Sequence, residues 1–466
     1  MINLSLHEIA KIISAELIGD SDVQITNSVE TDSRLVGKGS LFVAKPGETT
    51  DGHLYISNAI ANGAVAAIVE HPVTDSINQL VVKDSVAALG VLATFVVAEV
   101  KSKGELQVIG ITGSNGKTTT KNMLRAILAT AGETIAPEES FNNEVGAPYS
   151  MLKITENTKF LVVELGAGGL GSIQYLARMC KPDIAIELKV GLAHAGEFGG
   201  IEITEKIKAE LVEELSTIGI ALLNMDDARV SAMAKKTRAK IIRFGTTAEA
   251  DYRATNIKLN IEGTSFSLTR PDSSIDNVNL QILGEHHVYN ALAALSAADL
   301  LDVDRNASIR ALEQMKLAER WRMEKRLRKD GLVVINDAYN ASPESMKSAL
   351  QTLAQLGKLS GKKTYAVLGE MAELGEYSAH EHDSIGRFCV RLNLSQLLVV
   401  GQGAKLIHMG ASQEGSWDGE SKYFDEISDA LGYLREMLTG EEIVLIKSSK
   451  SANLRYLGDD LLEEIE

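Results

Sequence analysis

From residue 106 onward, short apolar runs alternate with segments that have the spacing of amphipathic helices. The runs LQVIGIT (106–112), KFLVVEL (159–165) and DIAIELKV (183–190) are apolar almost throughout, rather than at every second position. Such strands are typical of parallel sheets covered by helices on both faces, because each strand is then buried on both sides. The pattern therefore predicts an α/β fold built on parallel sheets.

Two breaks divide this pattern. The first hundred residues end in a long apolar helical segment and the polar stretch KSKGE (101–105), which is typical of a linker. The second break is the charged stretch KRLRKD (325–330), which separates a helical pattern from the next apolar run. At roughly 150 residues per domain, 466 residues suffice for three domains. We predict three α/β domains, at residues 1–104, 105–322 and 323–466.

Composition and charge limit the partners of the chain. It carries 47 Lys and Arg against 63 Asp and Glu, a net charge of −16, which argues against nucleic acid or an anionic membrane surface as the main partner. Cys180 and Cys389 lie far apart in the sequence, which favours a reducing compartment over a disulfide framework. The apolar stretch 86–98, bounded by Asp84 and Glu99, is shorter than a membrane span, and the start lacks a signal-peptide profile. We expect a cytoplasmic protein without membrane insertion.

The stretch VIGITGSNGKTTT (108–120) runs from an apolar strand through a glycine-rich turn into a helix. Gly113 and Gly116 allow a tight turn that points backbone N–H groups, and the positive end of the helix dipole, at a phosphate. Lys117 would neutralise the outer phosphates and the Thr118 hydroxyl would bind Mg²⁺. The strict G-x-x-x-x-G-K-[ST] spacing is not met, because isoleucine stands five positions before Gly116. A glycine-rich turn with a chance lysine is the alternative, and the strand–turn–helix context favours a nucleotide site.

Two polar residues follow apolar strands farther along the chain. Glu164 ends the strand FLVVE, and a carboxylate at the carboxyl end of a parallel strand lies where ligands collect in open α/β sheets. Its hard oxygens suit Mg²⁺. His194 follows another apolar run and can face the same crevice. The alternatives are a surface acid for Glu164 and a packed polar residue for His194.

Lys208 lies on the apolar stripe of its helix, because Leu211, Val212 and Leu215 follow it by three, four and seven positions. A buried ammonium is costly unless it is paired or loses its proton. A lowered pKa would expose a free amine that can take up CO₂, and the resulting carbamate could bind a second Mg²⁺ or hold a neighbouring group. The alternative is a lysine whose stem packs while its charge reaches solvent.

Motifs along nearly the whole chain resemble those of the Mur ligase family. In order, they are TDSR (31–34), GSLFVAKPGETTDGH (39–53), TGSNGKTTT (112–120), SFNNEVGAPYSML (140–152), VELGAG (163–168), GLAHAGEFG (191–199), IKAELVEEL (207–215), GEHHVYNALAA (284–294), RWRMEK (320–325), INDAYNASPESM (335–346) and VLGEMAELG (367–375). Each motif is modest alone, but their order makes the resemblance specific.

The resemblance implies an N-terminal UDP-binding α/β domain, a central P-loop ATPase-like parallel-sheet domain and a C-terminal Rossmann-like domain that binds the amino substrate. It implies an ATP-dependent amide ligase that acts through an acyl phosphate. Within the family, the NDAYNASPESM and VLGEMAELG segments favour the enzyme that joins D-alanyl-D-alanine to UDP-N-acetylmuramoyl-tripeptide in peptidoglycan precursor synthesis. A monomer that uses Mg²⁺ is the family expectation.

The resemblance also assigns residues. Those implied to bind ATP are Gly113, Ser114, Asn115, Gly116, Lys117, Thr118, Thr119, His286, Asn290, Arg322, Asp337, Tyr339 and Asn340. Those implied to face the UDP-linked substrate are Ser33, Arg34, Asp51, Gly52, His53, Asn142 and Asn143. The implied metal ligands are Thr118, Glu164, His194 and Lys208 as a carbamate, and the implied catalytic residues are Lys117, Lys208, His194 and Arg322.

Departures from the family pattern and rival functions remain. Gly168 and Lys189 stand where many members have Asn, and KSSKS (447–451) replaces the usual K-G-S-R, so that Lys450 lacks the bidentate contacts of an Arg.

One rival is a Mur ligase that adds a diamino acid, although its typical D-N-P-R-like segment is missing. Others are a folylpolyglutamate-synthetase-like protein, which the UDP-domain motifs disfavour, and a regulatory nucleotide-binding protein that ligates nothing. Lysine and diaminopimelate both stay open as the third residue of the acceptor peptide.

Overall fold

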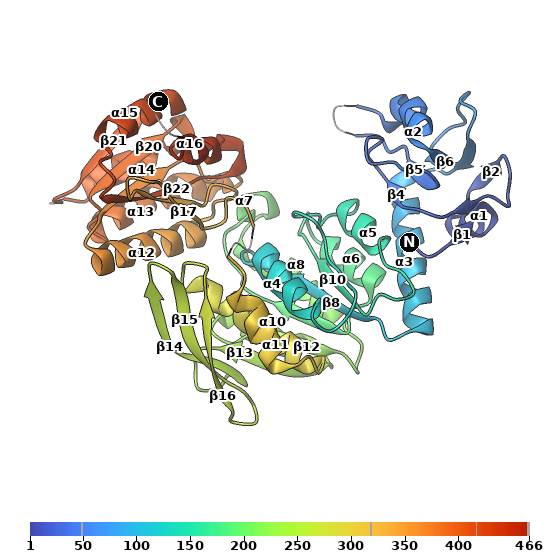
Figure 1. The fold of residues 1–466 in the computed structure, drawn as a ribbon, viewed down its shortest axis with the longest axis horizontal. Helices are drawn as coiled ribbons and strands as arrows, with labels where there is room; N and C mark the ends of the chain where they lie inside the picture. Colours follow the sequence, from blue (N-terminus) through green and yellow to red (C-terminus); the bar gives the residue numbers. More distant parts are fainter. Residues whose placement is uncertain (48–49, 317–318, 416, 464–466) are drawn as a thin grey trace.

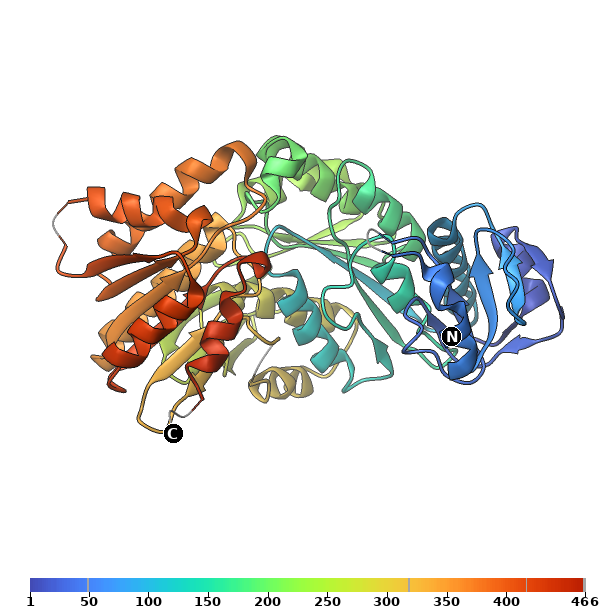
Figure 2. The same cartoon turned by 90° about the horizontal axis from the view of Figure 1, so that it is seen from above.

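The computed structural model describes residues 1–47, 50–316, 319–415 and 417–463. Three α/β domains follow one another along the chain, each built around its own sheet, as the alternation of strands and helices predicts. Figures 1 and 2 show the central domain between the N-terminal domain in blue and the C-terminal domain in orange and red. The predicted α/β fold class is therefore confirmed.

The N-terminal domain has a five-stranded sheet in the order β2-β7-β6-β5-β4, in which β2 alone is antiparallel to its neighbour. The described elements are β1 (Leu4–Ser5), α1 (Leu6–Ile13), β2 (Glu16–Ile18), β3 (Gln24–Ile25), β4 (Val29–Glu30), β5 (Ser40–Val43), η1 (Gly52–Tyr55), α2 (Ile56–Asn62), β6 (Ala64–Val69), β7 (Asn78–Val81) and α3 (Ser85–Lys103). Helix α1 begins at a capping box, in which Ser5 and Glu8 satisfy each other's backbone N–H groups.

The central domain has a nine-stranded sheet in the order β16-β15-β14-β13-β12-β11-β8-β10-β9. Its elements are β8 (Gln107–Thr112), α4 (Lys117–Leu128), β9 (Thr134–Ile135), α5 (Gly146–Met151), β10 (Phe160–Glu164), α6 (Ser172–Cys180), β11 (Ile184–Glu187), α7 (Ala195–Phe198), α8 (Ile201–Glu213), β12 (Ile220–Asn224), α9 (Ala228–Ala232), η2 (Met233–Lys236), β13 (Lys240–Gly245), β14 (Tyr252–Asn260), β15 (Gly263–Thr269), β16 (Ile275–Leu280), α10 (His286–Leu300) and α11 (Arg305–Glu313). The strands from β9 to β14 are parallel, as predicted.

The central sheet departs from an all-parallel one at one edge. Strands β14, β15 and β16 pair antiparallel. From residue 256 to residue 260 of β14, and along β16, every second residue is exposed, so one face of this sheet edge is open to solvent there, which antiparallel sheets tolerate. These alternating segments lack the near-continuous apolar runs on which the prediction of parallel strands was based.

The C-terminal domain has a six-stranded sheet in the order β17-β18-β22-β19-β20-β21, parallel except between β17 and β18. Its elements are β17 (Glu324–Leu327), β18 (Val333–Asn336), α12 (Pro343–Ser360), β19 (Lys363–Leu368), η3 (Gly375–Tyr377), α13 (Ser378–Arg391), β20 (Gln396–Val400), η4 (Gln402–Ala404), α14 (Lys405–Gln413), β21 (Glu420–Phe424), α15 (Ile427–Met437), β22 (Glu442–Lys447), η5 (Lys450–Ala452) and α16 (Leu454–Asp460). The charged stretch 325–330 is not a separate connection, because 325–327 belong to β17, the first strand of the C-terminal domain. An edge strand tolerates such charges, since one side of it faces solvent.

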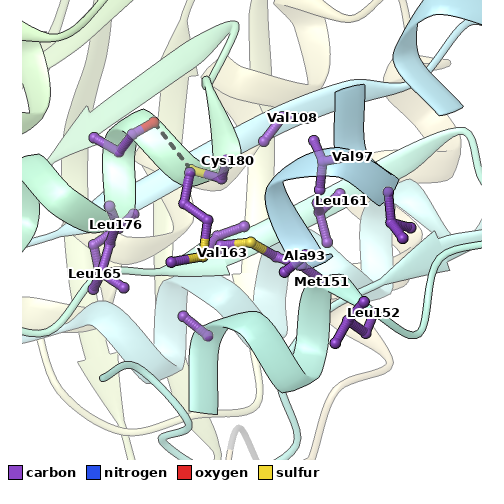
Figure 3. Packing of buried hydrophobic residues seen from close by; sticks show 14 of the residues in the cluster. Ala93, Val97, Val108, Met151, Leu152, Leu161, Val163, Leu165, Leu176 and Cys180 are labelled. Atoms are coloured by element: carbon purple, nitrogen blue, oxygen red, sulfur yellow. Dashed lines mark hydrogen bonds between the residues drawn. The ribbon is translucent and has the colours of Figure 1, made fainter. Parts of the chain in front are cut away.

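Helix α3 joins the first two domains through a shared core. Its buried residues belong to the same apolar cluster as residues of the central sheet and of α5 and α6. Figure 3 shows Ala93 and Val97 of α3 beside Val108, Leu161 and Met151 of the central domain. Packing of this kind holds the N-terminal domain in one orientation relative to the strands that end at the glycine-rich turn.

The length of α3 differs from expectation. The helix does not stop near Glu99 but continues to Lys103, where Lys103 forms an i,i+4 ion pair with Glu99 and Lys101 donates to Asp183 Oδ1 over 2.7 Å. Within the described residues, α3 is the one helix long and apolar enough to cross a membrane by length and composition, and half of its apolar window is buried inside the protein. The helix is thus longer than the apolar stretch 86–98 that it contains.

The shared core predicts unequal effects of two neighbouring substitutions in α3. Leu92→Ala should lower the free energy of unfolding by about 2–5 kcal/mol, because it leaves a cavity in the cluster. Val91→Ala, at a side chain that is 48% exposed, should change it by less than about 0.5 kcal/mol. Urea unfolding followed by circular dichroism measures both values, and equal effects would contradict the shared core.

Candidate active site

The glycine-rich turn between β8 and α4 has the conformation predicted for a phosphate loop. Gly116 lies in the left-handed region, with φ of 88°, and a Cβ there would come within 2.5 Å of Asn290 Oδ1. Lys117, the first residue of α4, donates to the carbonyl of Gly113 over 2.8 Å, so its ammonium lies across the loop. Burial lowers the pKa of Lys117, the charge of Arg322 lowers it further, and Glu164 raises it. The loop thus presents a half-buried cation beside the N-terminus of a helix, an arrangement that suits an anion.

Glu164, at the carboxyl end of β10, faces this loop. Its Oε1 accepts a hydrogen bond from Asn142 Nδ2 over 2.8 Å and lies 3.4 Å from Thr118 Oγ1. Its Oε2 is buried without a hydrogen-bond partner among the described residues. An unpaired carboxylate oxygen beside a threonine hydroxyl is a hard donor set of the kind that binds Mg²⁺. Glu164 is almost fully buried, so it is not a surface acid.

Lys208 is 3% exposed, so its stem does not carry the ammonium to the surface of the protein. Burial lowers its pKa to about 7, the charge of Lys117 acts in the same direction, and Glu187 opposes it. Glu187, at the end of β11, is fully buried, and neither of its carboxylate oxygens has a hydrogen-bond partner among the described residues. Desolvation raises the pKa of Glu187 well above its ordinary value.

His194 stands in the left-handed region, with φ of 62°, directly before α7. Its Nδ1 contacts the carboxylate of Glu373, in the C-terminal domain, and lies 3.8 Å from Glu197 Oε2. The three side chains are close enough to offer one ligand atom each to a metal ion. Burial lowers the pKa of His194 to about 4, with help from the charges of Lys117 and Lys208. The contact with Glu373 could not be predicted from the sequence, because it joins two domains.

The segment that enters the C-terminal domain brings Arg322 to the loop. Arg322 Nη2 lies 3.4 Å from the hydroxyl oxygens of both Thr118 and Ser140, and its guanidinium stacks 4.3 Å from the ring centroid of Tyr339. Lys447 is a site residue that sequence reasoning missed, although it begins the KSSKS segment. Its ammonium donates to Asp337 Oδ2 over 2.5 Å.

Helix α10 adds polar groups at its first turn. His286 Nδ1 and His287 Nε2 are buried without hydrogen-bond partners among the described residues. Burial lowers the pKa of His286 to about 4. Asn290 Oδ1 accepts from Thr120 Oγ1 over 3.3 Å, and Asn290 Nδ2 lies 3.1 Å from His287 Nδ1. His287 was not among the predicted residues, although it stands beside one of them.

One cavity of about 340 Å³, the interdomain cavity, lies between the central and C-terminal domains. The predicted residues that line it are Ser114, Asn115, Gly116, Lys117, Thr118, Thr119, Asn142, Glu164, His194, Lys208, His286, Asn290, Arg322, Asp337, Tyr339 and Asn340. Gly113 is not among the lining residues; it shapes the turn, with φ of 151°. The predicted phosphate and metal groups therefore face one space.

A second cavity, of about 980 Å³, lies over the N-terminal domain; we call it the N-terminal cavity. Ser33, Arg34, Gly52 and Asn143, all predicted to face the UDP-linked substrate, line it. Asp51 and His53 are not among its lining residues. Their side chains pair over 2.6 Å, and His53 Nε2 accepts from the backbone N–H of residue 70, so the pair braces the loop behind the cavity. Residues 48 and 49 of the GETTDGH motif lie outside the described residues.

The C-terminal domain is docked against the central domain around the interdomain cavity. Glu344 Oε1 accepts from the backbone N–H of Leu192 over 2.9 Å, and Ser342 Oγ donates to Asn115 Oδ1 over 3.1 Å. The backbones of Gly196 and Gly375 approach so closely that a Cβ on Gly196 would lie 2.3 Å from the backbone N of Gly375. Glycine at 196 is therefore required for this docking.

A phosphate loop, a strand-end carboxylate and a second α/β domain closed over both define a nucleotide-dependent enzyme. The chain belongs to the Mur ligase family. Three family descriptions match it: the catalytic domain of the Mur ligase family at residues 26–99, the Mur ligase middle domain at 111–298, and the Mur ligase glutamate ligase domain at 321–450.

Similar proteins cover the full length of the chain. A UDP-N-acetylmuramoyl-tripeptide–D-alanyl-D-alanine ligase of Mycobacterium bovis is 38% identical over 100% of this chain and 98% of its own. The ligase of the same name from Escherichia coli is 32% identical over 97% of each chain. A crystal structure of MurF from Acinetobacter baumannii matches with a TM-score of 0.89 and 31% identity over 99% of each chain. MurF of Thermotoga maritima, in complex with ADP, matches with a TM-score of 0.81 and 28% identity over 93% of this chain and 97% of that one.

The glycine contact predicts how the domains can be separated. Gly196→Ala should push the C-terminal domain outward, because the new Cβ meets backbone atoms that cannot rotate away. We expect a larger radius of gyration in X-ray scattering and a loss of ATP-dependent turnover of about 10²-fold. Gly432→Ala, in α15 with open space around it, is the control that should change neither. A compact, active Gly196→Ala variant would contradict this account of the docking.

Proposed function

We propose that this protein is an ATP-dependent amide ligase that joins D-alanyl-D-alanine to UDP-N-acetylmuramoyl-tripeptide. Full-length relatives of that name support this substrate pair. The observation that carries the proposal is one cavity in which Lys117, Glu164 and Lys208 meet Arg322 at the docked C-terminal domain. Such a cavity can gather a triphosphate and a carboxylate, two anions that repel each other in water.

The reaction needs an activated carboxylate, because an oxide ion is a poor leaving group. A terminal carboxylate oxygen of the tripeptide attacks the γ-phosphorus of ATP, which forms an acyl phosphate and releases ADP. The free amine of D-alanyl-D-alanine then attacks the acyl carbon, phosphate leaves with the bonding electrons, and the new amide nitrogen loses a proton. The protein contributes mainly positioning and charge stabilisation.

Lys117 and Arg322 supply the positive charge that this acidic chain lacks overall. Lys117 and the N–H groups of Ser114 to Thr119 would hold the β- and γ-phosphates, and Arg322 would reach them from the domain junction. We assign further ATP contacts to Gly113, His286, Asn290, Asp337, Tyr339 and Asn340. Because Arg322 and Tyr339 stack on each other, docking of the C-terminal domain orients both groups.

The donor set around Glu164 fits Mg²⁺. Thr118, Glu164 and His194 would hold it, and the unpaired Oε2 of Glu164 is the observation that supports this assignment. A bound Mg²⁺ neutralises phosphate charge. Asn142 fixes the orientation of the Glu164 carboxylate through its 2.8 Å hydrogen bond.

Lys208 would act as a carbamate, formed when its neutral amine adds to CO₂ and releases a proton. The fully buried position and a pKa near 7 support this modification, because an ammonium cannot react. The carbamate would turn a buried cation into an anion beside Lys117. That anion could hold a second Mg²⁺ or orient Lys117.

We assign residues 1–104 to the UDP-sugar, 105–322 to ATP and 323–466 to the dipeptide. Ser33, Arg34, Gly52 and Asn143 would contact the UDP-linked substrate in the N-terminal cavity, braced by Asp51 and His53, and Asn142 would contact the peptide. We further propose that the protein works as a monomer in the cytoplasm, in the peptidoglycan synthesis on which cell shape and division depend.

Removal of the loop cation tests the nucleotide site. Lys117→Ala should lower the rate of ligation by about 10²–10³-fold, because a preorganised group that stabilises transition-state charge is lost. Lys206→Ala, an exposed lysine of α8, is the matched control and should keep full activity. Release of ADP and phosphate is measured with both substrates and with each one omitted. Phosphate release that does not depend on D-alanyl-D-alanine would instead favour a regulatory ATPase.

The carbamate has a spectroscopic test. With ¹³C-bicarbonate, the wild-type protein and Lys206→Ala should show a carbamate carbon signal, and Lys208→Ala should lack it. The signal and the ligation rate should fall as the pH drops below about 7, because Lys208 then binds a proton and its amine no longer reacts. A short-chain carboxylic acid should partly restore activity to Lys208→Ala. Full activity of that variant without the acid would rule out the carbamate.

A further inference from the structure

A third cavity lies next to both the interdomain cavity and the N-terminal cavity. This connecting cavity, of about 280 Å³, lies between the segment Asn142–Glu144, the turn at Gly166 and the face of α6 that carries Tyr175. It shares Asn142 and Gly166 with the interdomain cavity, and it shares Asn143 and Glu144 with the N-terminal cavity. The three cavities therefore adjoin one another between the N-terminal domain and the phosphate loop.

The proposed function, on which this inference rests, fixes what must lie along these cavities. The acceptor holds its nucleotide end in the N-terminal cavity and its reactive carboxylate in the interdomain cavity. That carboxylate belongs to the third residue of the peptide, so the side chain of this residue begins next to the reacting atoms. The connecting cavity shares Asn142 and Gly166 with the interdomain cavity, so it is a space that this side chain can enter.

The chemistry of the connecting cavity favours a cation. Glu144 is exposed and forms no hydrogen bond or ion pair in the described part of the chain. Glu144 and Tyr175 line the same cavity from opposite elements, the 142–144 segment and α6. The described lining residues include no Lys, Arg or His. The remaining wall is neutral, and at Gly168 a Cβ would meet nothing closer than 3.9 Å.

We propose that the connecting cavity receives the side chain of the third peptide residue and that Glu144 pairs with its terminal ammonium. An acceptor that ends in L-lysine is then preferred over one that ends in diaminopimelate. Both side chains carry the ammonium, but diaminopimelate adds a carboxylate on the same carbon. That carboxylate would lie beside Glu144 with no cation in the lining to offset the repulsion.

Steady-state kinetics with two acceptors test this specificity. UDP-N-acetylmuramoyl-tripeptides that end in L-lysine or in meso-diaminopimelate are each offered with ATP and D-alanyl-D-alanine, and the amide product is quantified by mass spectrometry. We expect kcat/KM for the lysine acceptor to exceed that for the diaminopimelate acceptor by at least about tenfold. Glu144→Gln should raise KM for the lysine acceptor by about three- to tenfold with little change in kcat. The ratio of the kcat/KM values for the two acceptors should therefore become smaller.

Two further variants distinguish an effect of the charge at position 144 from a general effect of substitution. Glu144→Lys should invert the preference, because its ammonium repels that of lysine and attracts the extra carboxylate. Glu156→Gln removes a carboxylate charge from an exposed position outside the three cavities. It should leave kcat/KM for both acceptors unchanged.

The outcomes are distinct. Equal use of both acceptors, a preference for diaminopimelate, or an unchanged KM for lysine in Glu144→Gln would each overturn the specificity while the ligase function stands. Failure of the wild-type protein to ligate either acceptor would overturn the proposed function and this inference with it.

Discussion

Buried positive charge around the glycine-rich loop is the constraint on which the candidate site depends. Burial lowers the pKa of both Lys117 and Lys208. The charge of Lys117 lowers the pKa of Lys208 further, and the charge of Arg322, at the domain junction, lowers that of Lys117. Burial of like charges is costly in the free energy of folding, and Glu164 and Glu187 offset only part of that cost. Such an arrangement is stabilised most by an anion, and the loop and helix α4 present their N–H groups where a phosphate would complete it.

The surrounding fold holds these charges from two sides. Parallel strands β8, β10 and β11 end at one edge of the central sheet, so the loop, Glu164 and Glu187 meet there. Helices α8 and α10 then bring Lys208 and Asn290 to the same edge. The C-terminal domain contributes the remaining wall. Geometry at this edge is thus a consequence of sheet topology, and the local motifs alone do not determine it.

Much of this arrangement was predictable from sequence, for a physical reason. Near-continuous apolar runs identify strands buried on both faces, and the residues that follow such strands must gather at one sheet edge. The antiparallel strands β14 to β16 were not predicted, because they lack the near-continuous apolar runs of the parallel strands. Strand β17 was not predicted, because its charged residues resemble those of a linker. The contacts of His194 with Glu373, and of Lys447 with Asp337, join distant segments, and no local pattern reports them.

The two interdomain junctions differ in kind, and the difference bears on mechanism. Helix α3 places the N-terminal cavity at a fixed distance from the loop, because its apolar residues belong to the core of both domains. The C-terminal domain meets the loop through polar contacts and the close approach of Gly196 to Gly375. Under the proposed function, a rigid half would hold the acceptor while a docked half would bring Arg322 and Tyr339 to the phosphates. Since the positive charge is complete only when that half is docked, the reactive anhydride of the proposed reaction would form in a closed site, where water has least access to it.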